Sequence, residues 1–167
     1  MAGKAYLERM PMGIAGAITR PRDLTVEPVT LDTTNPFSGY GLPGKYVNDK
    51  FVPLEDGDTI DQVKGILVRP YPITSVADLA YLGVEANQIG DNLKRGYICV
   101  VVTAGSATSA KKGDPVYVRV ADGSTASPVG SFVLTADATA ESTPQLAKAE
   151  VMGPGEADGR IEIAFNI

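Results

Sequence analysis

The sequence contains no histidine, no tryptophan and only one cysteine among its 167 residues. Without histidine, the chain lacks the commonest general base and the commonest transition-metal ligand. One cysteine can form neither an internal disulfide nor a zinc cluster. Cys99 lies in the apolar run 97–102, which predicts a buried thiol rather than a nucleophile. We therefore predict a protein that is not an enzyme and has no catalytic residues, metal site or cofactor, with carboxylate chemistry as the one open route.

Long apolar runs are missing as well. No stretch approaches the roughly 18 apolar residues of a transmembrane helix, and residues 1–22 contain no apolar core of signal-peptide length. The sequence therefore predicts no membrane contact and synthesis in the cytoplasm.

Charge is distributed unevenly along the chain. Residues 1–22 hold four basic residues and one acidic residue, a net charge of +3. Because the whole chain carries −5, residues 23–167 carry −8. A basic start on an acidic body suits either an arm that docks on a partner or a frayed terminus. The acidic body disfavours nucleic-acid binding, which depends on neutralising phosphates.

Turn-forming residues are abundant, with 18 Gly and 12 Pro. Between them lie short runs rich in β-branched and aromatic residues, whose spacing is typical of a small antiparallel β-barrel or β-sandwich. A short helix over 76–82 is the only helix we expect. The predicted strands are 24–31, 45–47, 50–54, 63–71, 97–103, 115–120, 131–135, 147–152 and 160–167.

The domain organisation follows from this pattern. Residues 1–44 contain several prolines and three of the four methionines, and we predict an extended N-terminal arm there. Residues 45–167 are predicted to form the β-rich body, with an insertion around 72–92. The run 97–102 is apolar on both faces, so the strand is buried twice within the monomer or gives one face to a partner.

Three motifs imitate ligand sites. Residues 39–45 match the first seven positions of a P-loop, but Tyr46 replaces the required Ser or Thr, and Pro43 removes an amide. Residues 55–61 hold four carboxylates with the wrong spacing for an EF-hand loop, which favours a solvated turn. Lys111 and Lys112, with the basic pair at 94–95, favour a solvated turn or an acidic protein partner over nucleic acid.

Several segments, in order along the chain, resemble the landmarks of tailed-bacteriophage structural cement proteins, which decorate capsids. The segments are Tyr6-Leu7-Glu8-Arg9-Met10, Gly13 and Gly16, Gly65-Ile66-Leu67-Val68-Arg69, Lys94-Arg95-Gly96-Tyr97-Ile98, Ala104-Gly105 and Gly113-Asp114-Pro115-Val116-Tyr117-Val118. The resemblance implies a β-rich body on the outside of a bacteriophage capsid, made in the host cytoplasm. There it would bridge major capsid protein subunits, with an N-terminal segment contributing to the grip. Residues 30–44 and 72–92 depart from the family pattern, so no role is transferred to them.

For docking on the major capsid protein we expect arginines to pair with carboxylates and methionines to fill apolar gaps. The predicted docking residues are Tyr6, Arg9, Met10, Met12, Ile14, Arg20 and Arg22. A chain beginning near Asp23 is expected to fold yet not to bind shells. A homo-oligomer, dimer or trimer, suits icosahedral positions.

Two alternatives come from other functional classes. A carbohydrate or cell-surface binding module would gather its tyrosines on one face, and the candidates are Tyr40, Tyr46, Tyr71 and Tyr81. A carboxylate glycosidase would place two acidic groups across a cleft.

Overall fold

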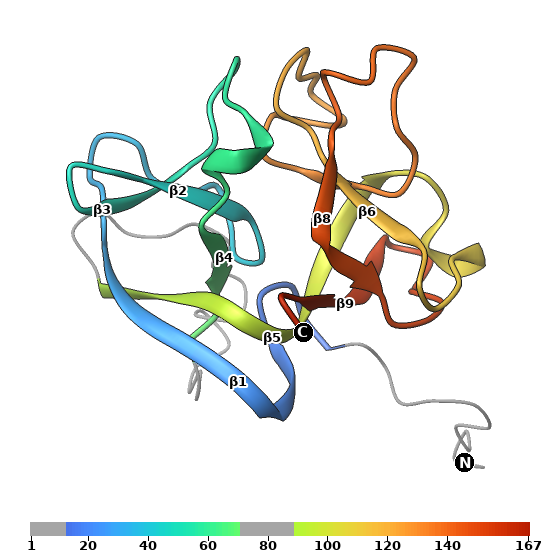
Figure 1. The fold of residues 1–167 in the computed structure, drawn as a ribbon, viewed down its shortest axis with the longest axis horizontal. Coiled ribbons are helices and arrows are strands. Elements are labelled where there is room, and N and C mark those ends of the chain that lie inside the picture. Colours follow the sequence, from blue (N-terminus) through green and yellow to red (C-terminus); the bar gives the residue numbers. More distant parts are fainter. Residues whose placement is uncertain (1–12, 71–88) are drawn as a thin grey trace, which may run out of the picture.

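The computed structural model describes residues 13–70 and 89–167 (Figure 1). Two 3-10 turns, Ile60–Gln62 and Ala107–Ser109, are the helical elements of this part, so the predicted all-β class is confirmed. The predicted helix over 76–82 lies outside the described residues. The strands are β1 (Ile18–Leu31), β2 (Pro43–Val47), β3 (Lys50–Pro53), β4 (Gly65–Val68), β5 (Ile89–Ala104), β6 (Pro115–Val118), β7 (Phe132–Val133), β8 (Gln145–Val151) and β9 (Arg160–Phe165).

Strand pairing closes two rings that share β5. One ring runs β1, β3, β2, β4, β5 and back to β1; the other runs β5, β7, β6, β8, β9 and back to β5. Most pairs are antiparallel, but β1 with β3 and β5 with β7 are short parallel contacts. Ring closure pairs strand edges that would otherwise be exposed. In Figure 1 the ring with β2, β3 and β4 lies to the left and the ring with β6, β8 and β9 lies to the right.

The long strand β5 changes partners at Gly96. Before this glycine, Leu93 pairs with Ile66 of β4, and from Gly96 onward the strand pairs with β9, beginning at Phe165. Gly96 has a φ of +146°, and a Cβ there would lie 3.1 Å from Cδ1 of both Leu24 and Leu93. Glycine therefore lets one continuous strand serve both rings.

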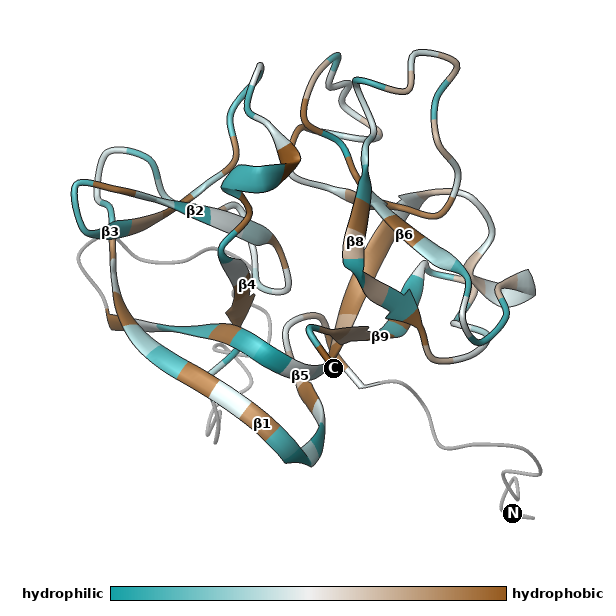
Figure 2. Ribbon diagram, in the orientation of Figure 1, coloured by the Kyte–Doolittle hydropathy of each residue, from teal (hydrophilic) through white to brown (hydrophobic). Residues whose placement is uncertain are grey.

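Two apolar clusters fill the molecule. β4 contributes to both, because its side chains alternate between faces: Ile66 and Val68 join the larger cluster, and Leu67 joins the smaller one with Phe37 and Phe51. Figure 2 shows the apolar residues that recur along β4, β5, β6 and β8. The larger cluster draws mainly on β4 to β9 and is the main core.

The apolar run 97–102 of β5 is buried on one face and partly buried on the other. Ile98 and Val100 are fully buried in the larger cluster. On the opposite face Cys99 is also fully buried, whereas Val101 is 37% exposed. The apolar run predicted to be buried twice is thus largely covered by the chain itself.

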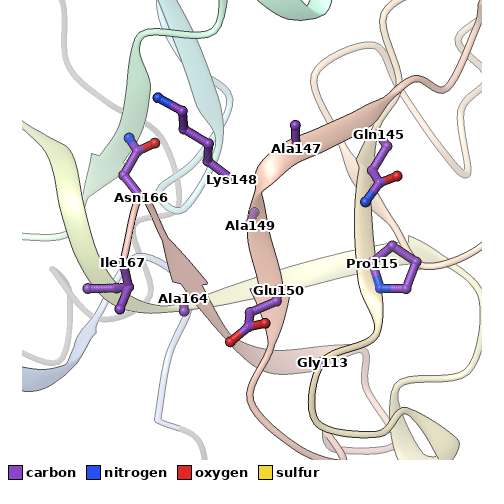
Figure 3. A pocket seen from close by; sticks show the side chains of 10 residues that line it. All are labelled: Gly113, Pro115, Gln145, Ala147, Lys148, Ala149, Glu150, Ala164, Asn166 and Ile167. Carbon is purple, nitrogen blue, oxygen red and sulfur yellow. The ribbon is translucent and has the colours of Figure 1, made fainter.

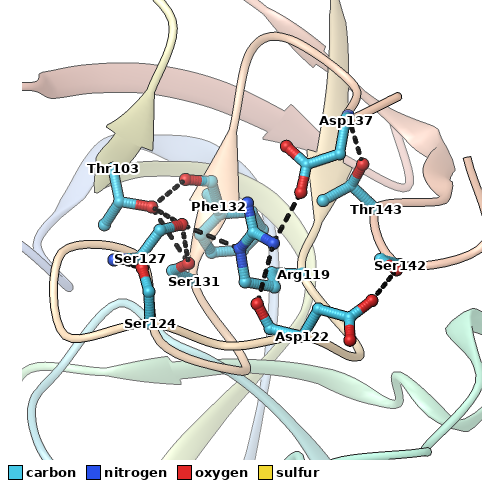
Figure 4. A network of polar contacts seen from close by, with 10 residues as sticks. All are labelled: Thr103, Arg119, Asp122, Ser124, Ser127, Ser131, Phe132, Asp137, Ser142 and Thr143. Carbon is cyan, nitrogen blue, oxygen red and sulfur yellow. Dashed lines mark hydrogen bonds and ion pairs between the residues drawn. The ribbon is translucent and has the colours of Figure 1, made fainter. Parts of the chain in front are cut away.

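A buried arginine fixes the long loops around β7 (Figure 4). Arg119 Nη1 lies 2.6 Å from Asp137 Oδ2, and its Nε donates to Ser127 Oγ at 2.9 Å. The hydroxyl of Thr103 in turn lies 2.7 Å from that of Ser127 and 3.0 Å from that of Ser131. Because these hydroxyls bond to one another and to the guanidinium, the network is suited to holding loops rather than to chemistry.

The predicted arm, residues 1–44, contains a long strand. β1 runs antiparallel to β5, from Ile18 opposite Ile98 to Thr30 opposite Ile89, with irregular register between Ile18 and Val26. The chain therefore contributes to the sheet from Ile18 onward, while residues 1–12 lie outside the described part. Of the predicted insertion 72–92, residues 89–92 begin β5 and the others lie outside the described part.

Candidate docking surface

Residues 13–20, which we call the arm root, are fastened to the body through their backbone. Gly16 N donates to Cys99 O at 2.8 Å, and Cys99 N donates to Ala17 O at 2.9 Å. On the other side, Arg69 N donates to Gly16 O at 2.9 Å. The root is thus held between β5 and the end of β4, and the position at which residues 1–12 join the body is set by backbone hydrogen bonds.

Two glycines allow this close approach. Gly16 has a φ of +82°, and a Cβ there would lie 2.6 Å from Tyr40 Cβ and 3.0 Å from Gly41 N. Gly41 has a φ of +76°, and a Cβ there would lie 2.8 Å from Gly16 N. Both positions require glycine for conformation and for space. The root can therefore pack against residues 40–41 only if positions 16 and 41 are both glycine.

Arg69 follows β4 and supports the same root. Its Nε donates to Ala15 O at 3.1 Å, and its guanidinium lies 4.7 Å from the centre of the Tyr40 ring. The residue is 6% exposed. Arg69 therefore links the root to β4 through both its backbone and its side chain.

The predicted docking residue Arg20 is bound within the monomer. Its Nε and Nη2 donate to the two carboxylate oxygens of Glu162 at 2.9 and 2.8 Å, and Thr19 Oγ1 donates to the same carboxylate at 2.6 Å. The guanidinium also lies 4.5 Å from the centre of the Tyr97 ring. The hydrogen bonds that Arg20 donates to the Glu162 carboxylate raise the pKa of Arg20. This bidentate pair ties the root to β9.

The other predicted docking residues divide into two groups. Ile14 is 38% exposed and Arg22 is also exposed, so both are available to a partner. Tyr6, Arg9, Met10 and Met12 lie outside the described residues. Ile14 and Arg20 therefore both belong to the arm root, and Arg22 follows two residues beyond it. Sequence reasoning missed the residues that hold the root, namely Gly41, Arg69 and Glu162.

Cys99 is a structural residue, as the sequence predicted. It is fully buried, and burial raises the pKa of its thiol to about 11. The thiol is therefore protonated and unreactive at neutral pH. Cys99 contributes to the arm root through the hydrogen bonds of its backbone.

Charged residues of the three motifs that resemble ligand sites form ion pairs within the chain. Lys45, the last residue of the P-loop-like motif, lies in β2 and binds Glu55 at 2.9 Å and Asp58 at 2.8 Å. The same contacts occupy two of the four carboxylates in the acidic turn. Lys94 and Arg95 each lie near a carboxylate of β1, those of Glu27 and Asp23 respectively. These charges contribute to ion pairs within the chain.

The tyrosines expected of a carbohydrate module do not form an open platform in the described part. The Tyr40 ring lies against Arg69, whereas Lys94 lies 5.3 Å from the centre of the Tyr46 ring. Tyr46 also accepts a hydrogen bond from Asn92 Nδ2 at 2.9 Å. Tyr71 and Tyr81 lie outside the described residues. Residues 13–70 and 89–167 also include no helix long and apolar enough to cross a membrane.

A depression of about 830 Å3 lies over β8 and β9 (Figure 3). Its lining includes Gln145, Lys148, Glu150 and Asn166, and the charged ends of Lys148 and Glu150 lie well apart. Polar groups that do not converge offer no site for a small ligand.

Comparison with known proteins identifies a family. The model of the XM1 gp53 minor capsid protein family matches residues 3–165, which includes most of the segment that precedes the root. A chain in the structure "The capsid of Myoviridae Phage XM1" is 20% identical, with a TM-score of 0.66 and alignment over 99% of this chain and 98% of that chain. At this identity the likeness shows a shared fold. Comparison with curated proteins finds no match.

Proposed function

The chain belongs to the XM1 gp53 minor capsid protein family, and from this premise we propose that it binds the outside of a bacteriophage capsid. There it bridges subunits of the major capsid protein and stabilises the shell. It acts as a structural protein of the virion surface and performs no catalysis. Residues 1–12 and the arm root form its main docking element, with a dimer or trimer as the assembled form.

The observation that carries this proposal is the rigid arm root. Backbone hydrogen bonds at Gly16 and Ala17 fix the root to β5, and the Arg20–Glu162 pair fixes it to β9. When the base of a docking segment is fixed in advance, less conformational entropy is lost on binding than when the base is free. A family match that begins at residue 3 also supports a role for this segment.

Shell stabilisation needs contact area across subunit boundaries rather than reactive groups. A ligand that binds only the assembled shell shifts the equilibrium toward assembly by mass action. The chain supplies a folded body to occupy one position, and residues 1–12 to contact a neighbouring subunit.

Titration of the purified protein onto empty capsid shells that lack it tests the proposal. We expect saturable co-sedimentation with the shells, and an increase in the temperature at which the shells come apart that grows with protein concentration. If the protein had no affinity for the shells, it would stay in the supernatant when the shells are sedimented. Absence of binding, or binding with no change in that temperature, would contradict the proposed function.

A further inference from the structure

A groove of about 610 Å3 lies beside the arm root, between β1, the end of β4 and the start of β5. Its lining is apolar apart from Arg69 and Asp91. The lining residues are Ile14, Ala17, Ile18, Pro21, Leu24, Val26, Val68, Arg69, Pro70 and Asp91.

The groove adjoins the main core of the molecule. Ile18 and Val26 pack against the larger apolar cluster, and Val68 belongs to it. Ile14 and Leu24, each 38% exposed, also line the groove. Isolated apolar side chains are ordinary on a protein surface, but a group of them beside a cavity marks an interaction site. An apolar side chain placed in the groove would extend the core.

Arg69 adds a polar requirement to the occupant. Its Nε is bonded to Ala15 O, whereas its Nη1 is buried and has no hydrogen-bond partner among residues 13–70 and 89–167. A buried donor without an acceptor is unfavourable and rare in folded proteins. Because Arg69 lines the groove, an occupant that brings an oxygen acceptor to this guanidinium together with an apolar side chain would satisfy both requirements.

Consecutive residues of the root contact β9 and line the groove. The carbonyl of Gly13 accepts a hydrogen bond from Arg160 of β9, and neither residue lines the groove. Ile14, the next residue, does line it. The root therefore connects the groove to residues 1–12 along the chain. When two docking contacts are joined in this way, the second binding event becomes intramolecular.

We infer that the groove binds an extended segment of the major capsid protein, which inserts an aliphatic or aromatic side chain and presents a carbonyl or carboxylate oxygen to Arg69. The inference rests on the proposed function and assigns a second contact to the same docking element. The groove grips one subunit while residues 1–12 engage its neighbour, so that the two contacts together bridge the shell.

Leu24→Glu tests this inference, with Val47→Glu as the matched control. Leu24 is 38% exposed and Val47 41%, so each change places a carboxylate at a similarly exposed site, but Val47 lies on β2 outside the groove. We expect both variants to melt like the wild type. Leu24→Glu should bind empty shells at least tenfold more weakly, and Val47→Glu should bind as the wild type does. Equal binding by the two variants overturns the inference.

Crosslinking identifies the occupant even if a substitution disturbs folding. Leu24→Cys can carry a thiol-linked photocrosslinker, because the native Cys99 is fully buried with its pKa raised to about 11 and remains unlabelled. We expect crosslinks to the major capsid protein. Crosslinks only to a second copy of this chain, or none, overturn the inference. If the wild type itself fails to bind shells, the proposed function fails; if it binds and only these tests fail, the groove alone is refuted.

Discussion

Removing residues 1–12 is expected to abolish binding to empty capsid shells while leaving the body folded. The segment carries four of the predicted docking residues, Tyr6, Arg9, Met10 and Met12. Loss of several central contacts, each worth about 1–2 kcal/mol or more, weakens an interface by two or more orders of magnitude. We therefore expect at least a 100-fold loss of affinity in co-sedimentation, with an unchanged melting temperature.

The position of the cut decides whether this experiment is clean. A chain beginning near Asp23, the truncation suggested by the sequence alone, would remove Ile18 from the core and Arg20 from Glu162. Glu162 is only 9% exposed, and a buried carboxylate without its partner destabilises the fold. A cut after Met12 keeps the whole root, so lost binding can be assigned to the segment rather than to unfolding.

The matched control for the truncation removes charge elsewhere. Lys111→Ala combined with Lys112→Ala deletes two exposed basic side chains from the body, as the truncation deletes Lys4 and Arg9. We expect this variant to bind shells normally. If the truncated chain binds as tightly as the wild type, residues 1–12 are not the docking element, and the contacts must lie elsewhere on the body.

Gly16→Ala is expected to lower the free energy of unfolding by roughly 2–4 kcal/mol, which combines a left-handed conformation with a steric overlap in a packed region. The new methyl group would meet Tyr40 Cβ at 2.6 Å and two backbone nitrogens, of Arg69 and Gly41, at 3.0 Å. Backbone atoms cannot turn aside as a flexible side chain would, so the root must shift. Urea unfolding measures the loss directly.

Gly13→Ala separates the two causes. Gly13 has a φ of +85°, close to the +82° of Gly16, but a Cβ at Gly13 would meet no atom of the described residues within 4 Å. We expect it to cost about 1 kcal/mol, the conformational part alone. If Gly16→Ala destabilises the protein no more than Gly13→Ala does, then the root is not packed against Gly41 as described.

Local patterns were enough to predict the class of fold. The β-branched runs that became β4, β5, β6 and β9 were each visible as short segments between turn residues, and nothing in the chain favoured long helices. The burial of Cys99 followed from its apolar neighbours in the same way. These features depend on residues close together in the sequence, which is where propensity and periodicity are informative.

Pairings between distant segments could not be predicted. Whether residues 18–31 form an arm or a strand depends on β5, some 70 residues later. Likewise, the sequence alone predicts Arg20 to be a free charge for docking, because its partner Glu162 lies 142 positions away in the chain. The sequence shows a glycine at position 16 and another at position 41, which was a partial signal of a close approach at each. Only the folded chain shows that the two glycines contact each other.

A reconstruction of the native particle that carries this protein tests the central claim most directly. We expect density for the β-rich body on the outer surface of the shell, with the N-terminal segment extending from the root onto a neighbouring major capsid protein subunit, and with a shell residue seated between Leu24 and Arg69. Density on the inner surface, or a body that touches a single subunit with its N-terminal segment directed away from the shell, would contradict it.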